Sequence, residues 1–265
     1  MWVPAGNAHA IEQVTLAFVF SEKVPLKMLD ASLEHVDEER DKGTYSVKGD
    51  VTAANIQVKV GAENEVRSQN DKMGYAYFVD QDGTVEGARF TKELAVISSV
   101  SYGTWSGFKE EYERVMVPFL KKVLLATSLR AVKLEYSDRF VFDGDPSAAD
   151  VSQIVETSKL GLPDNAFGQG FPWHSRRGWF VPADNGAILV NLDIAESQVA
   201  HRDEPQKPLL SIHLGTMLEA RFDAHVDDVQ ELNNIVEQLH NQSKGVTRSA
   251  LTVDAANMIG LEDVA

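Results

Sequence analysis

The chain of 265 residues contains no cysteine. Disulfide bonds, thiolate nucleophiles and cysteine-ligated zinc or iron–sulfur sites are therefore excluded. No apolar run approaches the ~20 residues with which a helix crosses a membrane. The first ten residues also lack the basic and apolar regions of a signal peptide. We therefore expect a cytoplasmic protein that does not interact with membranes.

Basic residues are scarce as well. The chain has 25 Lys and Arg against 40 Asp and Glu, which gives a formal net charge of −15 at pH 7. A charge of this sign repels phosphate backbones and anionic lipids, so we expect no general nucleic-acid binding. The same charge could attract a basic protein partner, although a solvated acidic surface explains the composition without one.

The common catalytic motifs are missing too. There is no GxSxG elbow and no GxxxxGK[ST] loop, and Gly168-Gln169-Gly170 lacks the third glycine of a dinucleotide fingerprint. The seven histidines form no HxH, HxxxH or HExxH pair, so we expect neither a bound metal nor a cofactor. Whether the protein is an enzyme stays open, and these absences favour a non-enzymatic protein.

What the chain does have is one clear helix followed by one clear strand. Apolar residues recur at three- and four-residue steps from Trp105 to Leu124, which predicts one helix stripe. Thr104 can cap this helix, and Pro118 should bend it. After Ser128 the period becomes two, and one strand face holds Val132, Leu134, Tyr136, Phe140 and Phe142. Asp138 alone interrupts that face, which favours a strand twist, bulge or edge.

A strand with one polar face is typical of an antiparallel or mixed sheet that helices cover on one side. We therefore predict an α+β fold with long amphipathic helices on one side of the sheet. Further helices are expected over residues 25–36, 146–161 and 226–239, with a short one after Thr252. Residues 63–72 are expected to form a loop, and 81–83 and 184–186 to form hairpin turns.

The chain divides naturally near residue 143. Both parts run through strands into a long amphipathic helix, and a linker-like Asp-Gly-Asp-Pro segment separates them. We therefore expect an N-terminal α+β half over residues 1–143 and a C-terminal α+β half over 144–265. They form either two similar units or one continuous domain.

The most unusual segment is residues 171–180, which joins aromatic and basic side chains beside a glycine-containing loop. Trp and Arg are enriched at binding hot spots. The predicted binding residues are Trp173, His174, Arg176, Arg177 and Trp179. The alternative is that both tryptophans belong to the core and that the arginines pair with local acids.

Loose motifs also run along most of the chain. They are Ala10-Ile-Glu12, Trp105-Ser-Gly-Phe108, Leu134-Glu-Tyr-Ser-Asp-Arg139, Leu192-Asp193 and Leu239-His240. In these motifs the chain resembles a sporadically distributed, functionally uncharacterised prokaryotic family of about this length. The third motif of that family is close to Leu-Arg-Tyr-Ile-Asn-Arg, from which Glu135 and Asp138 depart.

The resemblance implies no established activity, and its patchy distribution suits defence or toxin-linked loci. It marks as structural or functional Glu12, Trp105, Phe108, Tyr136, Asp138, Arg139 and Asp193.

Three functional hypotheses are compatible with these observations. The first is a non-enzymatic protein-binding module, such as an immunity, antitoxin or accessory component of a prokaryotic defence system, with a basic partner such as a nuclease. The second is a small-molecule sensor or enzyme with a pocket between sheet and helices, lined or capped by His174, Arg176 and Arg177. The third is a structural subunit of a larger complex. A homo-oligomer is compatible with each.

Overall fold

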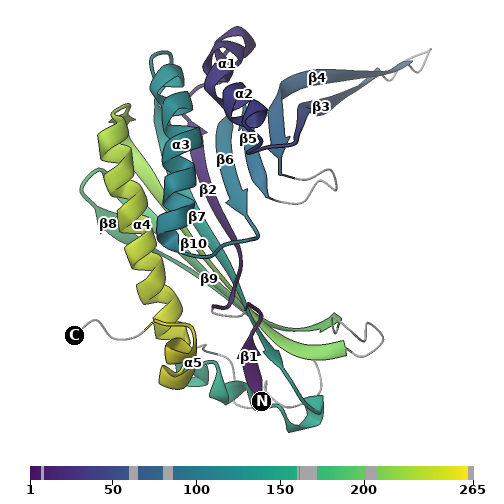
Figure 1. The fold of residues 1–265 in the computed structure, drawn as a ribbon, viewed down its shortest axis with the longest axis vertical. Helices are drawn as coiled ribbons and strands as arrows, with labels where there is room; N and C mark the ends of the chain where they lie inside the picture. The colour runs from purple at the N-terminus through teal and green to yellow at the C-terminus, as the bar shows by residue number, and fades with distance from the viewer. Residues whose placement is uncertain are drawn as a thin grey trace.

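The computed structural model describes residues 1–6, 9–59, 65–79, 86–159, 161, 172–200 and 208–261. The described strands form one ten-stranded antiparallel sheet in the order β3-β4-β5-β6-β2-β7-β10-β9-β8, and β1 pairs with β7 beside this path (Figure 1). The strands are β1 (Trp2–Pro4), β2 (Ile11–Phe20), β3 (Val47–Lys59), β4 (Glu65–Phe78), β5 (Gly87–Thr91), β6 (Leu94–Ser99), β7 (Leu129–Phe142), β8 (His174–Ala183), β9 (Gly186–Ala200) and β10 (Pro208–Val226).

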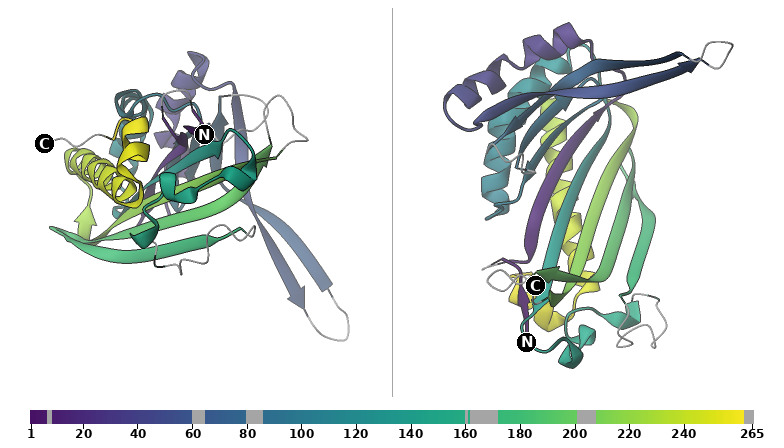
Figure 2. Two further views of the ribbon diagram at one scale, coloured as in Figure 1. Left: turned by 90° about the horizontal axis from the view of Figure 1, so that it is seen from below. Right: turned by 90° about the vertical axis from the view of Figure 1, so that its right-hand side faces the viewer.

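Helices cover one face of this sheet. They are α1 (Leu26–Ser32), α2 (Glu34–Asp41), α3 (Trp105–Val123), α4 (Val229–Ala250) and α5 (Val253–Met258). Figure 2 shows α3 and α4 along one side of the curved sheet, and the β3–β4 hairpin projecting from one end. The predicted α+β class is confirmed. The strands of residues 1–143 and 144–265 join where β7 pairs with β10, and the similarity of the two halves stays a prediction.

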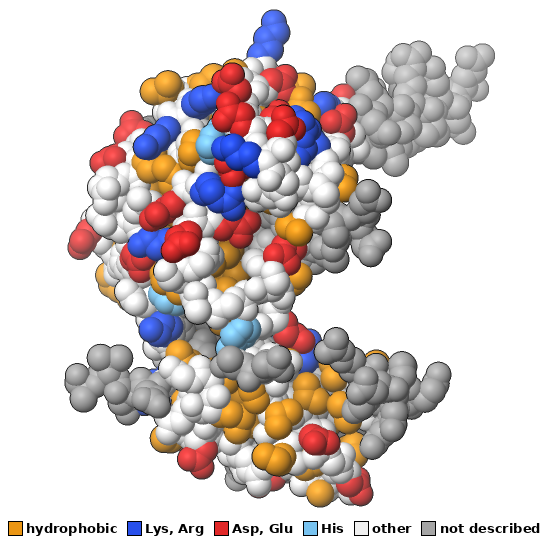
Figure 3. Space-filling model, viewed as in Figure 1, with side chains coloured by type: hydrophobic (Ala, Val, Ile, Leu, Met, Phe, Trp, Pro, Cys, Tyr) orange, Lys and Arg blue, Asp and Glu red, His pale blue; other side chains and the backbone are white. Residues whose placement is uncertain are grey.

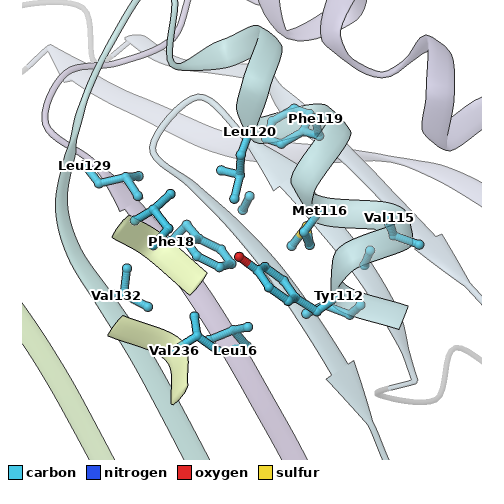
Figure 4. Packing of buried hydrophobic residues seen from close by; sticks show 14 of the residues in the cluster. Leu16, Phe18, Tyr112, Val115, Met116, Phe119, Leu120, Leu129, Val132 and Val236 are labelled. Atoms are coloured by element: carbon cyan, nitrogen blue, oxygen red, sulfur yellow. The ribbon is translucent and has the colours of Figure 1, made fainter. Parts of the chain in front are cut away.

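The main core lies between the sheet and α1–α4. Helix α3 begins as predicted, because the Thr104 hydroxyl accepts a hydrogen bond from the backbone N–H of Gly107 at 3.2 Å. Its apolar stripe is buried, and the Tyr112 ring stacks on Phe18 of β2 with the centroids 5.7 Å apart. Figure 4 shows these side chains pointing toward one another from the helix and the sheet.

A second core cluster occupies the other end of the sheet, around α5 and the N-terminus. Its members come from β1, the far halves of β7 and β10, β9, the chain after β7, and α5, and they include Trp2, Phe140, Phe142, Val151, Ile154, Trp173, Ile194, Ile212, Leu251 and Ala255. The molecule therefore has two apolar cores along one sheet.

Three local predictions are wrong. The helix expected over 25–36 is interrupted at Leu33 and continues as α2 to Asp41, because the Ser32 hydroxyl donates to the Met28 carbonyl and the Leu33 N–H bonds only three residues back. The helix expected over 146–161 is replaced by three 3-10 turns, over 146–148, 151–153 and 157–159. Asp145 and Asp150 each accept from a backbone N–H two residues on, so each caps a separate short turn.

The loop expected over 63–72 is also wrong from residue 65 onward, where β4 pairs with β3. Main-chain pairing needs no apolar face, and a Lys72–Asp50 ion pair of 2.7 Å adds to it. The predicted turn at 184–186 is confirmed: β8 and β9 pair up to Ala183 and Gly186, and Gly186 has a φ of 104°. The expected turn at 81–83 and the Gly168–Gly170 segment lie outside the described residues.

Candidate ligand pocket

A cavity of about 300 Å³ lies between the sheet and the helices. Its walls come from the start of β2, the loop before α3, the middle of β7, α4 and the chain after α5. It sits where the two core clusters meet, since it is lined both by Tyr136 of the first and by Ala10 of the second. The space-filling view shows the surface hollowed between the upper and lower parts of the molecule, with histidine side chains at this level (Figure 3).

One wall is a fixed aromatic group. The indole ring of Trp105 stacks on the imidazole of His240, with centroids 4.0 Å apart and planes 6° from parallel. The Tyr136 hydroxyl and Nδ1 of His240 share a hydrogen bond of 2.9 Å. The Tyr102 ring meets Tyr136 edge to face at 6.1 Å. Trp105 is anchored by its indole N–H, which donates to the Glu237 carboxylate at 3.2 Å. These contacts hold the wall in place before any ligand enters.

This wall is uncharged near neutral pH. Burial, with a smaller effect from Lys244, lowers the pKa of His240 to about 4, so its imidazole is neutral. Burial raises the pKa of Tyr136 well above its usual value and that of Tyr102 to about 12, so both phenols keep their protons. The aromatic wall therefore offers hydrogen bonds and ring faces but no charge.

Asp138 supplies the charge of the pocket. It follows Tyr136 by two residues on β7, so both side chains take the same face of the strand. Only 3% of Asp138 is exposed, and no described residue donates a hydrogen bond to its carboxyl group. Burial, together with the nearby Glu12 carboxylate, raises the pKa of Asp138 to about 7. The group is therefore balanced between its neutral and ionised forms.

The irregularity predicted from Asp138 lies in the neighbouring strand. Ile11 of β2 pairs with Asp138, whereas Gln13 pairs with Ser137, so Glu12 is an extra residue in a β-bulge. A bulge bends its strand and redirects the adjacent side chains. The bulge lies beside Asp138, and its neighbour Ile11 lines the cavity with Asp138.

Of the other residues marked by the family resemblance, Glu12, Arg139 and Asp193 lie on the opposite face of the sheet. Arg139 follows Asp138 and points the other way, where its Nε donates to both Glu12 oxygens at 2.8 Å and its guanidinium also donates to Ser197 and Ser211. Asp193 bonds the His174 ring nitrogen at 2.8 Å. Phe108 is buried in the main core. The structure thus brings together only Trp105, Tyr136 and Asp138 of that set.

The predicted binding segment lies on β8, at the edge of the sheet and away from the pocket. Trp173 is buried, and its indole N–H donates to Glu196 at 3.0 Å, so this residue belongs to the core. His174, Arg176 and Arg177 are exposed and do not line the pocket, which corrects the expectation that they line or cap it. Trp179 is 39% exposed.

Sequence reasoning missed the contribution of α4. Residues 240, 243, 244 and 247 all line the pocket, and their spacing places them on one helix face. In the sequence they form a polar interruption, His-Ser-Lys-Thr, within an otherwise apolar helix pattern. That interruption is the signal that could have identified them.

No family model matches the chain, and a comparison with curated proteins gives no match. Among the described residues, no three His, Asp or Glu side chains are grouped so as to hold a metal ion. No helix in the described part of the chain is long and apolar enough to cross a membrane. The pocket is therefore interpreted from its own geometry.

Proposed function

We propose that the protein binds a small organic ligand in this pocket and acts as a ligand-binding or sensor protein. The observation that carries the proposal is the Asp138 carboxyl group, buried at the cavity wall without a hydrogen-bond donor from the described residues. Its oxygens are not among the fully enclosed atoms that lack a partner, so they reach the cavity, where water or a ligand can supply their hydrogen bonds. Such a group marks a binding position, because a ligand can supply the missing partner.

The shape and chemistry of the cavity support the same proposal. About 300 Å³ is the lower end of the range for small-molecule sites. Such sites combine mostly apolar walls with a few placed polar groups, here Asp138 and the Tyr136–His240 pair. Neither Tyr136 nor His240 suits proton transfer near neutral pH, since the pKa of the first is raised and that of the second is lowered. Asp138, with a pKa of about 7, is the one group of these three whose pKa suits proton transfer.

A pocket-blocking variant tests the proposal. Gly103 is an exposed residue at the rim of the cavity, and a Cβ atom added there meets no atom within 4 Å, so Gly103→Phe places a ring at the cavity mouth without displacing a core contact. Gly49 on β3 is equally open and lies away from the pocket, so Gly49→Phe is the matched control. Native mass spectrometry of protein purified from its host should find a retained small molecule on the parent and on Gly49→Phe. The molecule should be absent from Gly103→Phe, and an equal mass on all three would refute the proposal.

A second candidate function is protein binding at β8. This strand ends the order of the described sheet, and a partner can add a strand at the end of a sheet. Phe180 is 60% exposed, with the guanidinium of Arg221 centred 5.6 Å from its ring, and Trp179 lies beside it. Arg176 and Arg177 add positive charge. These features fit an extended acidic segment of a partner that adds to the sheet edge.

The local charge at β8 therefore points to an acidic partner, whereas the net charge of −15 favours a basic one elsewhere on the surface. The defence-related role, the structural-subunit role and membership of the resembling family stay predictions that rest on the sequence motifs alone.

A further inference from the structure

We propose that the pocket selects an organic cation, a protonated amine or amidine attached to a flat ring, whose charged group pairs with the Asp138 carboxylate. This inference rests on the proposed ligand-binding function and adds the chemical class of the ligand.

The first argument is the missing positive charge. Arg139, the nearest basic residue in the sequence, lies on the other face of the sheet, where Glu12 neutralises it. Lys244 and His9 also line the cavity, but neither forms an ion pair or a hydrogen bond with Asp138 among the described residues. A buried carboxylate is stable only if a proton or a cation neutralises it. Since the described residues supply no cation at this point, a positively charged ligand can do so.

The second argument is the character of the walls. Tyr102, Trp105 and Tyr136 surround the space in front of Asp138 with aromatic rings. Ring faces attract ammonium and amidinium groups, and the attraction grows when water is excluded. The low pKa of His240 keeps its imidazole neutral, so this ring does not repel a cation. An anionic ligand would meet both Asp138 and the field of Glu12, and we expect it to be excluded.

The third argument is size. A cavity of about 300 Å³ accommodates one substituted ring with a short side chain. The seam between the two cores is lined by Ala10, Ile11 and Ile259 as well as the aromatic group. These apolar side chains suit the hydrocarbon part of such a ligand, while the charged group reaches Asp138.

Three probes of similar size but different charge test the chemical class of the ligand. Benzylamine carries the cation, benzyl alcohol is its neutral counterpart, and sodium benzoate is the anion. Isothermal titration at pH 8 should show benzylamine binding at least tenfold more tightly than the alcohol, and benzoate not binding. Asp138→Asn keeps the shape of the side chain and should remove this preference. Glu135→Gln, on the exposed face of the same strand, should leave it unchanged.

The pH dependence gives a second readout. A proton must leave Asp138 before the amine can pair with it, so benzylamine affinity should rise about tenfold from pH 6 to pH 8 given the pKa of about 7. Benzyl alcohol should show no such rise. In Asp138→Asn the benzylamine affinity should be flat across this range.

The outcomes separate the two proposals. The cation proposal would be overturned by any of three results: equal affinity for amine and alcohol, a preference for the amine that persists in Asp138→Asn, or amine binding that persists in Gly103→Phe. If native mass spectrometry then identifies a neutral or acidic ligand whose retention Gly103→Phe abolishes, the ligand-binding function stands and only the class is wrong. If the parent protein binds none of the probes and retains no small molecule, both proposals fail.

Discussion

Replacing Asp138 by Asn should stabilise the protein, and increasingly so as the pH rises. The folded-state pKa of Asp138 is about 7, against an ordinary value of 3.8. A raised pKa means that the fold favours the protonated group, so its contribution to stability is fully present below pH 3.8 and is lost as the pH rises toward 7. The resulting loss is about 0.5 kcal/mol at pH 4, about 1.5 kcal/mol at pH 5 and about 4 kcal/mol at pH 8.

Asparagine cannot ionise, so the stability of Asp138→Asn does not fall with pH for this reason. Its free energy of unfolding relative to the parent should therefore rise by about 3–4 kcal/mol between pH 4 and pH 8. Urea denaturation of both proteins at pH 4, 5, 6 and 8, without ligand, measures the difference. Any constant cost of burying the amide cancels in this comparison, as does the titration of His240, which both proteins share.

Glu135→Gln provides the control, because it removes a carboxylate from an exposed site on the same strand. Its effect should stay within about 0.5 kcal/mol of zero at every pH. If the Asp138→Asn difference is as flat as that of the control, Asp138 has a partner or is hydrated in the folded protein. The ligand site proposed at Asp138 would then lose its main support.

Three further predictions concern other parts of the structure. Phe108→Ala and Trp105→Ala should each lower the free energy of unfolding by about 3–5 kcal/mol in urea, since one ring is buried and the other stacks on His240; losses below about 1 kcal/mol would contradict this packing. The pKa of His240 is depressed from 6.5 to about 4, so its contribution is present above pH 6.5 and is lost as the pH falls through 4; His240→Phe should reduce the acid-induced loss of stability in that window by about 2–3 kcal/mol, and an unchanged pH profile would argue against it. Arg176→Ala combined with Arg177→Ala should leave the melting temperature unchanged but weaken at least tenfold the binding of any acidic partner captured at β8, measured by titration; undiminished binding would mean that this edge is only structural.

The elements that sequence reasoning identified best are those with a long and regular period. Helix α3 begins at the expected cap, Thr104, and β7 alternates as expected from residue 129 to 142. The β3–β4 hairpin was not predicted, because residues 65–72 include only one apolar side chain. Pairing through main-chain groups leaves no periodic pattern in the sequence. The helix expected over 146–161 was wrong because Asp145 and Asp150 each cap the start of a separate short turn, which a propensity argument does not capture.

Three residues of the pocket could be singled out from the sequence, but their assembly into one site could not. The family resemblance marked three of the lining residues as structural or functional, namely Trp105, Tyr136 and Asp138. Their assembly depends on His240, which lies 104 residues after its partner Tyr136. A periodic pattern shows which face of a strand a residue takes, but it does not show which helix covers that face. Asp138 of β7 indicated a strand twist, bulge or edge, and the register shift lies at Glu12 of the neighbouring strand β2 for the same reason.

The position of the pocket follows from two interruptions that coincide. On β7, Asp138 separates Tyr136 of the main core from Phe140 of the second core. On α4, the polar residues 240, 243, 244 and 247 line the cavity at the same level. A cavity at the boundary between two cores removes few contacts from either core.

A side chain that blocks the mouth of this cavity, as in Gly103→Phe, should therefore abolish ligand binding while changing the free energy of unfolding by less than about 1 kcal/mol, because no existing core contact is displaced. A large loss of stability in this variant would show instead that the space belongs to the packed core.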